Sequence, residues 1–168
     1  MGHGGVSRRR RAVAAGAVGL VLVAGYAVAG AFQILVWNPL AAVPGATLEE
    51  IHAEMARANE TLAAPLVLTW AVVGVVLAAS VVLAALAGST TRVKTVVVLE
   101  LLILVLGAPS HWFAAFPAGM GIADAFLIGG GDYAPWGGLL YAVSLAALFA
   151  LVVIALAGRR RREDAILK

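Results

Sequence analysis

Residues 66–87 read LVLTWAVVGVVLAASVVLAALA and contain no charged side chain. An α-helix rises 1.5 Å per residue, so this run reaches about 33 Å, and the hydrocarbon core of a bilayer is about 30 Å thick. A lone β-strand would leave its backbone groups unpaired in lipid. The run therefore predicts a membrane-spanning helix.

Composition places the whole chain in the same class. The 168 residues are 62% hydrophobic, against about 45–50% in ordinary soluble domains, and only 12% are charged. The mean hydropathy is +0.99. Water cannot solvate so much apolar surface, which indicates an integral membrane protein without a sizeable soluble domain. The chain has no cysteine, which excludes disulfides, thiolate metal sites and thiol catalysis.

Four apolar runs are long enough to span a membrane, at about residues 12–36, 66–87, 95–116 and 139–157. We expect an all-α fold, an integral membrane four-helix transmembrane bundle over residues 12–157. Basic tails, residues 1–11 and 158–168, flank it. The heavy use of Ala, Val, Gly and Arg is typical of a bacterial genome rich in G and C.

The first run also fits a secretory signal peptide. Arginines 8–11, an apolar stretch and the small residues Ala27 and Ala29 imitate its three regions, and Ser7-Arg8-Arg9 is similar to the start of a twin-arginine signal. The apolar stretch is longer than the usual 7–15 residues or so and continues through Val36. We favour an uncleaved first helix.

Charge predicts the orientation. With four spans, every Lys and Arg except Arg57 falls on one side, and most acids fall on the other. Basic residues stay on the cytoplasmic side of a membrane, so we expect a multi-pass protein of the cell membrane with both termini cytoplasmic. The pI of about 9.8 then reflects arginine clusters that face anionic lipid headgroups, and we expect no nucleic-acid partner.

Tryptophan supports this orientation independently. Four of them, Trp37, Trp70, Trp112 and Trp136, lie near the predicted outer ends of the runs. Amphipathic rings prefer the headgroup level of a bilayer. We interpret them as an outer aromatic belt opposite the basic side.

The first outer loop, residues 38–64, contains a helix signal of its own. Thr47 and Glu50 form a capping-box pattern, and apolar residues recur after them at helical spacing. We predict a short amphipathic helix on the outer face. Its acidic surface suits packing on the protein better than binding to anionic lipid.

Glu100 is the one acid inside a predicted span, about 9 Å along the helix from Lys94. Charge within a membrane is expensive, so such a residue is a functional candidate that could carry protons or hold a cation. The structural alternative is that a shallow Glu100 leans toward the headgroups and pairs with Lys or Arg there. We favour the structural interpretation.

His111 lies at the other end of the same run. Eleven residues, about 16 Å of helix, separate it from Glu100, so the two form no catalytic dyad if the helix is continuous. Pro109 should kink or end the helix, and we place His111 at the outer boundary.

Glu49 and His52 have the Glu-x-x-His spacing of di-iron bundles, but a single copy in an outer loop predicts no metal, and we expect no cofactor.

Residues 117–137 are rich in Gly and Pro, which interrupt regular helix. They could form a re-entrant segment, an interfacial segment or a surface loop. His111, Asp124 and Asp132 could converge there at the outer mouth. With Glu100, these are our four candidate functional residues.

Small residues four apart predict close helix packing, within a bundle or against a partner. The pairs are Ala15 with Gly19, Gly25 with Ala29, Gly74 with Ala78, and Ala142 through Ala146 to Ala150.

Our leading hypothesis is an interaction or accessory subunit of a membrane complex, without enzymatic chemistry of its own. The alternative is a small oligomeric transporter or ion-coupled permease that uses Glu100. A membrane enzyme that uses His111 and Asp124 comes third.

Overall fold

The computed structural model describes the backbone of residues 3–166 and the side chains of residues 5–160. Within that range all regular secondary structure is helical, which confirms the all-α prediction. The elements are α1 (His3–Phe32), a π-helical turn η1 (Gln33–Trp37), α2 (Asn38–Ala42), α3 (Leu48–Arg57), α4 (Ala64–Leu86), α5 (Val93–Phe126) and α6 (Trp136–Ile166). Four stretches are long and apolar enough to span a membrane, Gly5–Ala42, Ala64–Leu86, Val93–Phe126 and Trp136–Arg160, and they indicate a multi-pass membrane protein.

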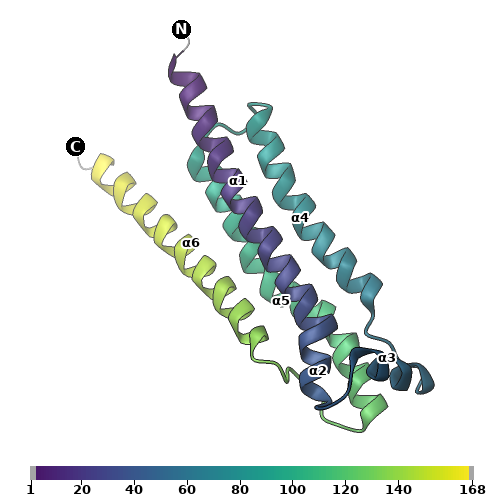
Figure 1. The fold of residues 1–168 in the computed structure, drawn as a ribbon. Coiled ribbons are helices and arrows are strands. Elements are labelled where there is room, and N and C mark those ends of the chain that lie inside the picture. The colour runs from purple at the N-terminus through teal and green to yellow at the C-terminus, as the bar shows by residue number, and fades with distance from the viewer. Residues whose placement is uncertain (1–2, 167–168) are drawn as a thin grey trace.

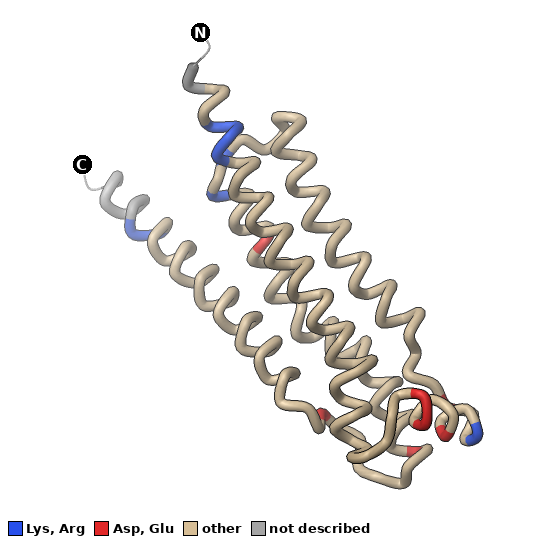
Figure 2. The backbone as a smooth tube through the Cα atoms, in the orientation of Figure 1, with Lys and Arg blue, Asp and Glu red and all other residues tan. Residues whose placement is uncertain are grey.

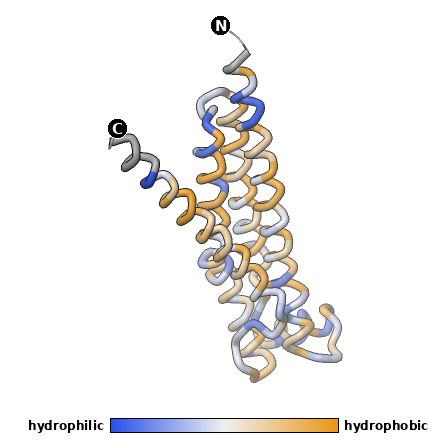
Figure 3. Tube along the Cα trace, turned by 90° about the vertical axis from the view of Figure 1, so that its left-hand side faces the viewer, coloured by the Kyte–Doolittle hydropathy of each residue, from blue (hydrophilic) through white to orange (hydrophobic). Residues whose placement is uncertain are grey.

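The long helices form an elongated bundle (Figure 1). Helix α1 packs against both α4 and α5, whereas α6 packs mainly on α5 and touches α1 little. The C-terminal half of α6 diverges from α1, as Figures 1 and 3 show from two directions. Both ends of the chain lie at the same end of the bundle, and α2 and α3 lie at the other.

Charge is segregated along this axis. In Figure 2 the described Lys and Arg gather at the end that carries both termini, apart from Arg57 of α3. Apolar residues dominate the helices between the two ends (Figure 3). The described acids other than Glu100 belong to the opposite end, so the charge asymmetry of the sequence is also an asymmetry in space.

The helices are longer than the apolar runs that predicted them. Helix α1 begins at His3, so residues 8–11 are helical, and the helix continues through η1 and α2 to Ala42. Helix α6 likewise runs on into residues 158–166. Arg is a good helix former, so the backbone stays helical where hydropathy falls.

Helix α5 corrects our expectation that the third helix ends near Phe116 and gives way to a segment broken by Gly and Pro. It runs without a break through Pro109 and Pro117 to Phe126. The Ser110 hydroxyl donates to the carbonyls of Leu106 (2.6 Å) and Gly107 (3.1 Å), beside the turn that Pro109 interrupts. Within the stretch 117–137, only residues 127–135 form a loop. Leu127 ends α5 in the left-handed conformation.

Tertiary packing explains why α5 continues. Its last turns bury Ala118 and Ile122 in a cluster with Ile51 and Met55 of α3. Because these contacts cover one face of the extension, they compensate for the weak helix propensity of its Gly and Pro residues. Residues 117–126 are therefore the part of α5 against which α3 packs, and they are not a separate loop.

The capping box at the start of α3 is present as predicted. Glu50 N–H donates to the Thr47 hydroxyl at 3.2 Å, and Thr47 N–H donates back to Glu50 Oε2 at 2.7 Å. Two hydrogen bonds to its carboxylate lower the pKa of Glu50. The larger effect comes from the Thr47 backbone N–H and the smaller one from the Thr47 hydroxyl. These bonds fix the direction in which α3 leaves the preceding turn.

Glycines let the long helices approach closely at three levels. A Cβ at Gly19 would overlap the side chain of Glu100, and one at Gly107 would lie 2.8 Å from the Tyr26 ring. A Cβ at Gly30 would lie 2.5 Å from the Trp70 ring. Each glycine therefore makes room for a large side chain of a neighbouring helix.

We predict that Gly30→Ala lowers the thermal unfolding midpoint in detergent, because the added methyl overlaps the Trp70 ring. Overpacking of this kind costs about 1–3 kcal/mol. Gly25→Ala is the matched control, since nothing lies within 4 Å of its added Cβ and Ala is the better helix former by about 0.5–1 kcal/mol. Size-exclusion chromatography of heated samples measures both. Equal midpoints for the two variants would contradict the packing at Gly30.

Candidate functional site

His111 connects all four long helices. It projects from α5, is fully buried, and lies against Gly30 of α1. Its ring centroid is 5.5 Å from that of Trp70 on α4 and 5.9 Å from that of Tyr141 on α6, both in edge-on geometry. His111 does not lie at a helix end, because α5 continues beyond it to Phe126.

Trp70 shares this inward position. Its indole N–H donates to the Ser110 hydroxyl at 2.9 Å, and its ring packs near Tyr26 with centroids 6.4 Å apart. It therefore contributes to the packing around His111. Trp112 and Trp136, by contrast, are half-exposed.

The π-helical turn η1 places two buried polar side chains beside the 127–135 loop. Asn38 Oδ1 accepts from the backbone N–H of Tyr133 (2.7 Å) and of Ala134 (3.3 Å), while its Nδ2 donates to the Gly131 carbonyl (3.2 Å). Gln33 Nε2 donates to the Ala134 carbonyl at 3.3 Å and reaches Asp132 Oδ1 at 3.5 Å. Together they hold the loop against the end of α1.

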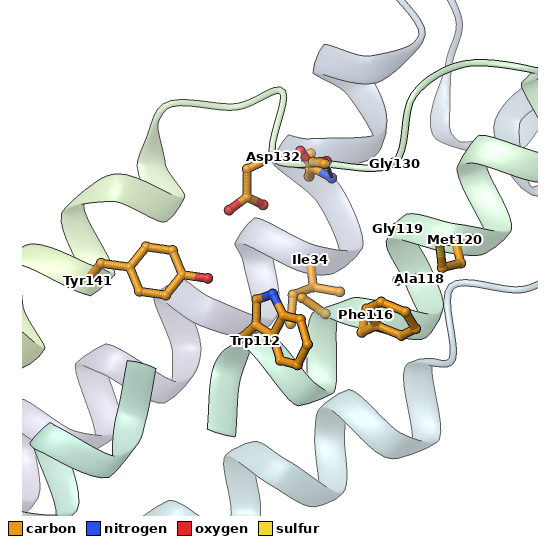
Figure 4. Close-up of a pocket in the computed structure, with 12 residues that line it drawn as sticks. Ile34, Trp112, Phe116, Ala118, Gly119, Met120, Gly130, Asp132 and Tyr141 are labelled. Atoms are coloured by element: carbon orange, nitrogen blue, oxygen red, sulfur yellow. Dashed lines mark hydrogen bonds between the residues drawn. The ribbon is translucent and has the colours of Figure 1, made fainter. Parts of the chain in front are cut away.

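A cavity of about 240 Å³ opens between this loop and the C-terminal half of α5 (Figure 4). Its walls come from η1, α5, α6 and the loop. The lining residues are Ile34, Asn38, Trp112, Ala115, Phe116, Ala118, Gly119, Met120, Gly130, Gly131, Asp132 and Tyr141. The cavity is thus mostly apolar and aromatic, with one carboxylate.

The structure brings together part of the predicted outer mouth. Asp132 lines the cavity, and His111 lies directly behind Tyr141, another lining residue. Asp124 does not join them, because it is exposed, does not line the cavity, and lies thirteen residues, about 20 Å of helix, beyond His111. The expected convergence of three residues is therefore limited to His111 and Asp132.

Glu100 is buried between helices at the other end of the bundle, with 3% of its surface exposed. It packs against Gly19 of α1, and neither carboxylate oxygen has a hydrogen-bond partner among the described residues. Within the same range the only ion pair joins Arg57 to Glu54. Among the described residues Glu100 therefore has no basic partner, and Gly19 lets its side chain lie inside the bundle.

Glu100 and His111 remain two separate features. Helix α5 is continuous between them, so about 16 Å of axis separates the two residues. Among the described side chains, no three His, Asp, Glu or Cys residues gather as a metal site would require. The arrangement offers a buried carboxyl at one end and an aromatic cavity with a carboxylate at the other.

Sequence reasoning missed Gln33, Asn38 and Tyr141. Gln33 is the only strongly polar residue of the first run, and that was the one available signal. Asn38 and Tyr141 gave none, because a single uncharged polar residue at a predicted boundary is common. Their roles depend on a loop more than ninety residues away from Asn38.

The chain matches no known family model, and no curated protein and no solved structure is significantly similar to it.

We predict that Glu100→Leu raises the thermal unfolding midpoint of the purified protein. A buried polar group without a partner costs about 1–3 kcal/mol, and leucine removes that cost while filling the space beside Gly19. Glu100→Gln is the control, since it keeps the size and polarity and should change the midpoint little. A lower midpoint for Glu100→Leu alone would show that the carboxyl has a stabilising partner.

Proposed function

We propose that the protein is an interaction or accessory subunit of a membrane complex, with no enzymatic chemistry of its own. The observation that carries the proposal is an exposed ridge of small residues on α6. Gly138, Ala142 and Ala146 are exposed and Ala150 is half-buried, each four residues after the last. In lipid, such ridges let two helix backbones approach closely, because packing and not hydrophobicity drives helix association.

Two other small residues are used inside the bundle. Gly19 accommodates Glu100, and Ala78 is buried in a cluster with Val23 of α1. The α6 ridge has no such partner among the described residues. Since α6 rests mainly on α5, its remaining surface is free to receive a helix of another subunit.

We predict that the ridge binds a stoichiometric partner in mild detergent, and that Ala146→Leu removes this partner by separating the two helices. Ala155→Leu is the matched control. Ala155 is also exposed, but nine residues of helix place it on the opposite side of α6. Affinity purification with mass spectrometry measures the partner. Purification of the chain alone, or only with further copies of itself, would contradict the proposal.

We further propose a location in the cell membrane with both termini cytoplasmic. The clustering of basic residues at the end with the termini supports it, because positive charge remains on the cytoplasmic side (Figure 2). In this orientation the arginine clusters face anionic lipid headgroups, and α3 is an amphipathic helix of the first outer loop, docked on α5.

The orientation predicts which sites an impermeant thiol reagent reaches. The chain has no cysteine, so single replacements at two exposed positions, Ala58→Cys and Ser89→Cys, report without background. We expect Ala58→Cys to react in intact cells whose wall is permeable to the reagent, and Ser89→Cys to react only after lysis. The reverse pattern would overturn the orientation.

A small transporter or ion-coupled permease is the second candidate function, and the burial of Glu100 favours it. An ionisable group enclosed in a span, without a partner, is a common feature of proton and ion pathways. In this role Glu100 would carry a proton or hold a cation between α1 and α5.

The second candidate predicts that Glu100→Gln abolishes proton or monovalent-cation flux in proteoliposomes, because glutamine keeps the shape but cannot titrate. Asp124→Asn is the control, since Asp124 is exposed and outside the bundle interior. Flux that persists in Glu100→Gln, or that is absent from the wild type, would rule out this role for Glu100.

A further inference from the structure

We propose that the cavity between the 127–135 loop, α5 and α6 binds a small organic ammonium group, with Asp132 as its counter-charge and three aromatic rings as its walls. The site shares no residue with the α6 ridge and does not include Glu100. The inference depends on neither of the functions proposed above.

The carboxylate of Asp132 lacks a cationic partner. It forms no ion pair among the described residues, and its one hydrogen bond is a long contact of 3.5 Å from Gln33 Nε2. No Lys or Arg lines the cavity. In Figure 4 the carboxylate points into the same space as the Tyr141 hydroxyl, above the Trp112 ring. A ligand in this space meets an unneutralised negative charge, which favours cations and disfavours anions.

The walls suit an organic cation better than a metal ion. Trp112, Phe116 and Tyr141 line the cavity. The ring centroids of Trp112 and Phe116 are 5.6 Å apart, and the two ring planes form an angle of 48°. Aromatic faces attract an ammonium group through the quadrupole of the ring, and Trp does so best. Metal ions instead need several oxygen or nitrogen ligands, and among the described residues no three His, Cys, Asp or Glu side chains gather to supply them.

The size of the cavity limits the ligand. Its volume of about 240 Å³ is below the 300–1,000 Å³ or so that is usual for drug-sized ligands. An ammonium group with short substituents fits that space, whereas a large amphiphile does not. The hydrogen bonds of Asn38 to Gly131, Tyr133 and Ala134 hold the Asp132 loop in place, so the site is pre-formed.

Two sources could supply this group. One is a free quaternary or primary amine in solution, and the other is the ethanolamine headgroup of a membrane lipid. The 127–135 loop that borders the cavity lies at the end of the bundle opposite the termini (Figure 1). The chemistry of recognition is the same for both, so the experiment must separate them.

The test is calorimetric titration of the full chain in detergent with choline, which is a quaternary ammonium. Its neutral counterpart of the same shape, 3,3-dimethylbutan-1-ol, is titrated in parallel. We expect choline to bind and the neutral alcohol to bind at least about tenfold more weakly, because only choline gains the charge-assisted contact. In a second arm, native mass spectrometry compares retention of phosphatidylethanolamine and phosphatidylglycerol.

Variants assign the binding to this cavity. Asp132→Asn keeps the shape of the side chain and should weaken choline binding about tenfold. Asp124→Asn removes an exposed carboxylate elsewhere on α5 and should leave binding unchanged. Trp112→Leu keeps Asp132 and removes one aromatic wall, so we expect binding about two- to five-fold weaker. Circular dichroism and gel filtration establish that each variant is folded.

Every outcome decides the proposal. Choline binding that Asp132→Asn weakens and Asp124→Asn does not supports a soluble ammonium ligand. Selective retention of phosphatidylethanolamine that Asp132→Asn abolishes supports the lipid headgroup. Equal binding of choline and its neutral counterpart would overturn the proposal, and so would the absence of both choline binding and lipid selectivity in the wild type.

Discussion

The bundle depends on the absence of a side chain at three helix positions. Lipid tails are as apolar as leucine, so the hydrophobic effect does not hold transmembrane helices together, and close packing must do so. Gly19, Gly30 and Gly107 each admit a large side chain from a neighbouring helix, respectively Glu100, Trp70 with His111, and Tyr26. Each of these four side chains carries a polar group. The same contacts that bring the helices together therefore also bring polar groups into the interior.

The middle of the bundle shows how that polarity is satisfied. The Ser144 hydroxyl of α6 donates to the Leu104 carbonyl of α5 at 2.8 Å and lies 3.3 Å from the Tyr26 hydroxyl of α1. Three helices thus share one small hydrogen-bonded group. Glu100 and His111, above and below this level, have no comparable partners among the described residues. They are the interior positions at which a proton, an ion or a partner could change the energy of the bundle most.

Hydropathy predicted the existence and order of the spans, because the run at 66–87 and its three counterparts have no other stable state in lipid. It could not predict where helices end. Helix α5 passes Pro109 and Pro117 because α3 covers its last turns, and that contact joins residues far apart in the sequence. The charged members of the site, Glu100 and Asp132, were identifiable because charge is rare in this chain. Their surroundings were not, since Gly19 is one of 19 glycines and the contacts of Asn38 join it to a loop more than ninety residues away.

The π-helical turn at Gln33–Trp37 explains why one end of the bundle has a cavity. In a π-turn each N–H bonds to the carbonyl five residues earlier, and here the Asn38 N–H bonds to the Gln33 carbonyl. Residues five apart are therefore stacked on one face, whereas an ordinary α-helix would turn them well away from each other. Both amides consequently reach the same loop and hold Asp132 over Trp112 and Tyr141. Such turns carry no sequence signature, yet they are frequent at functional sites. The local widening of α1 is therefore the feature that places a carboxylate beside aromatic rings, and it does so at the end of the bundle farthest from the basic clusters.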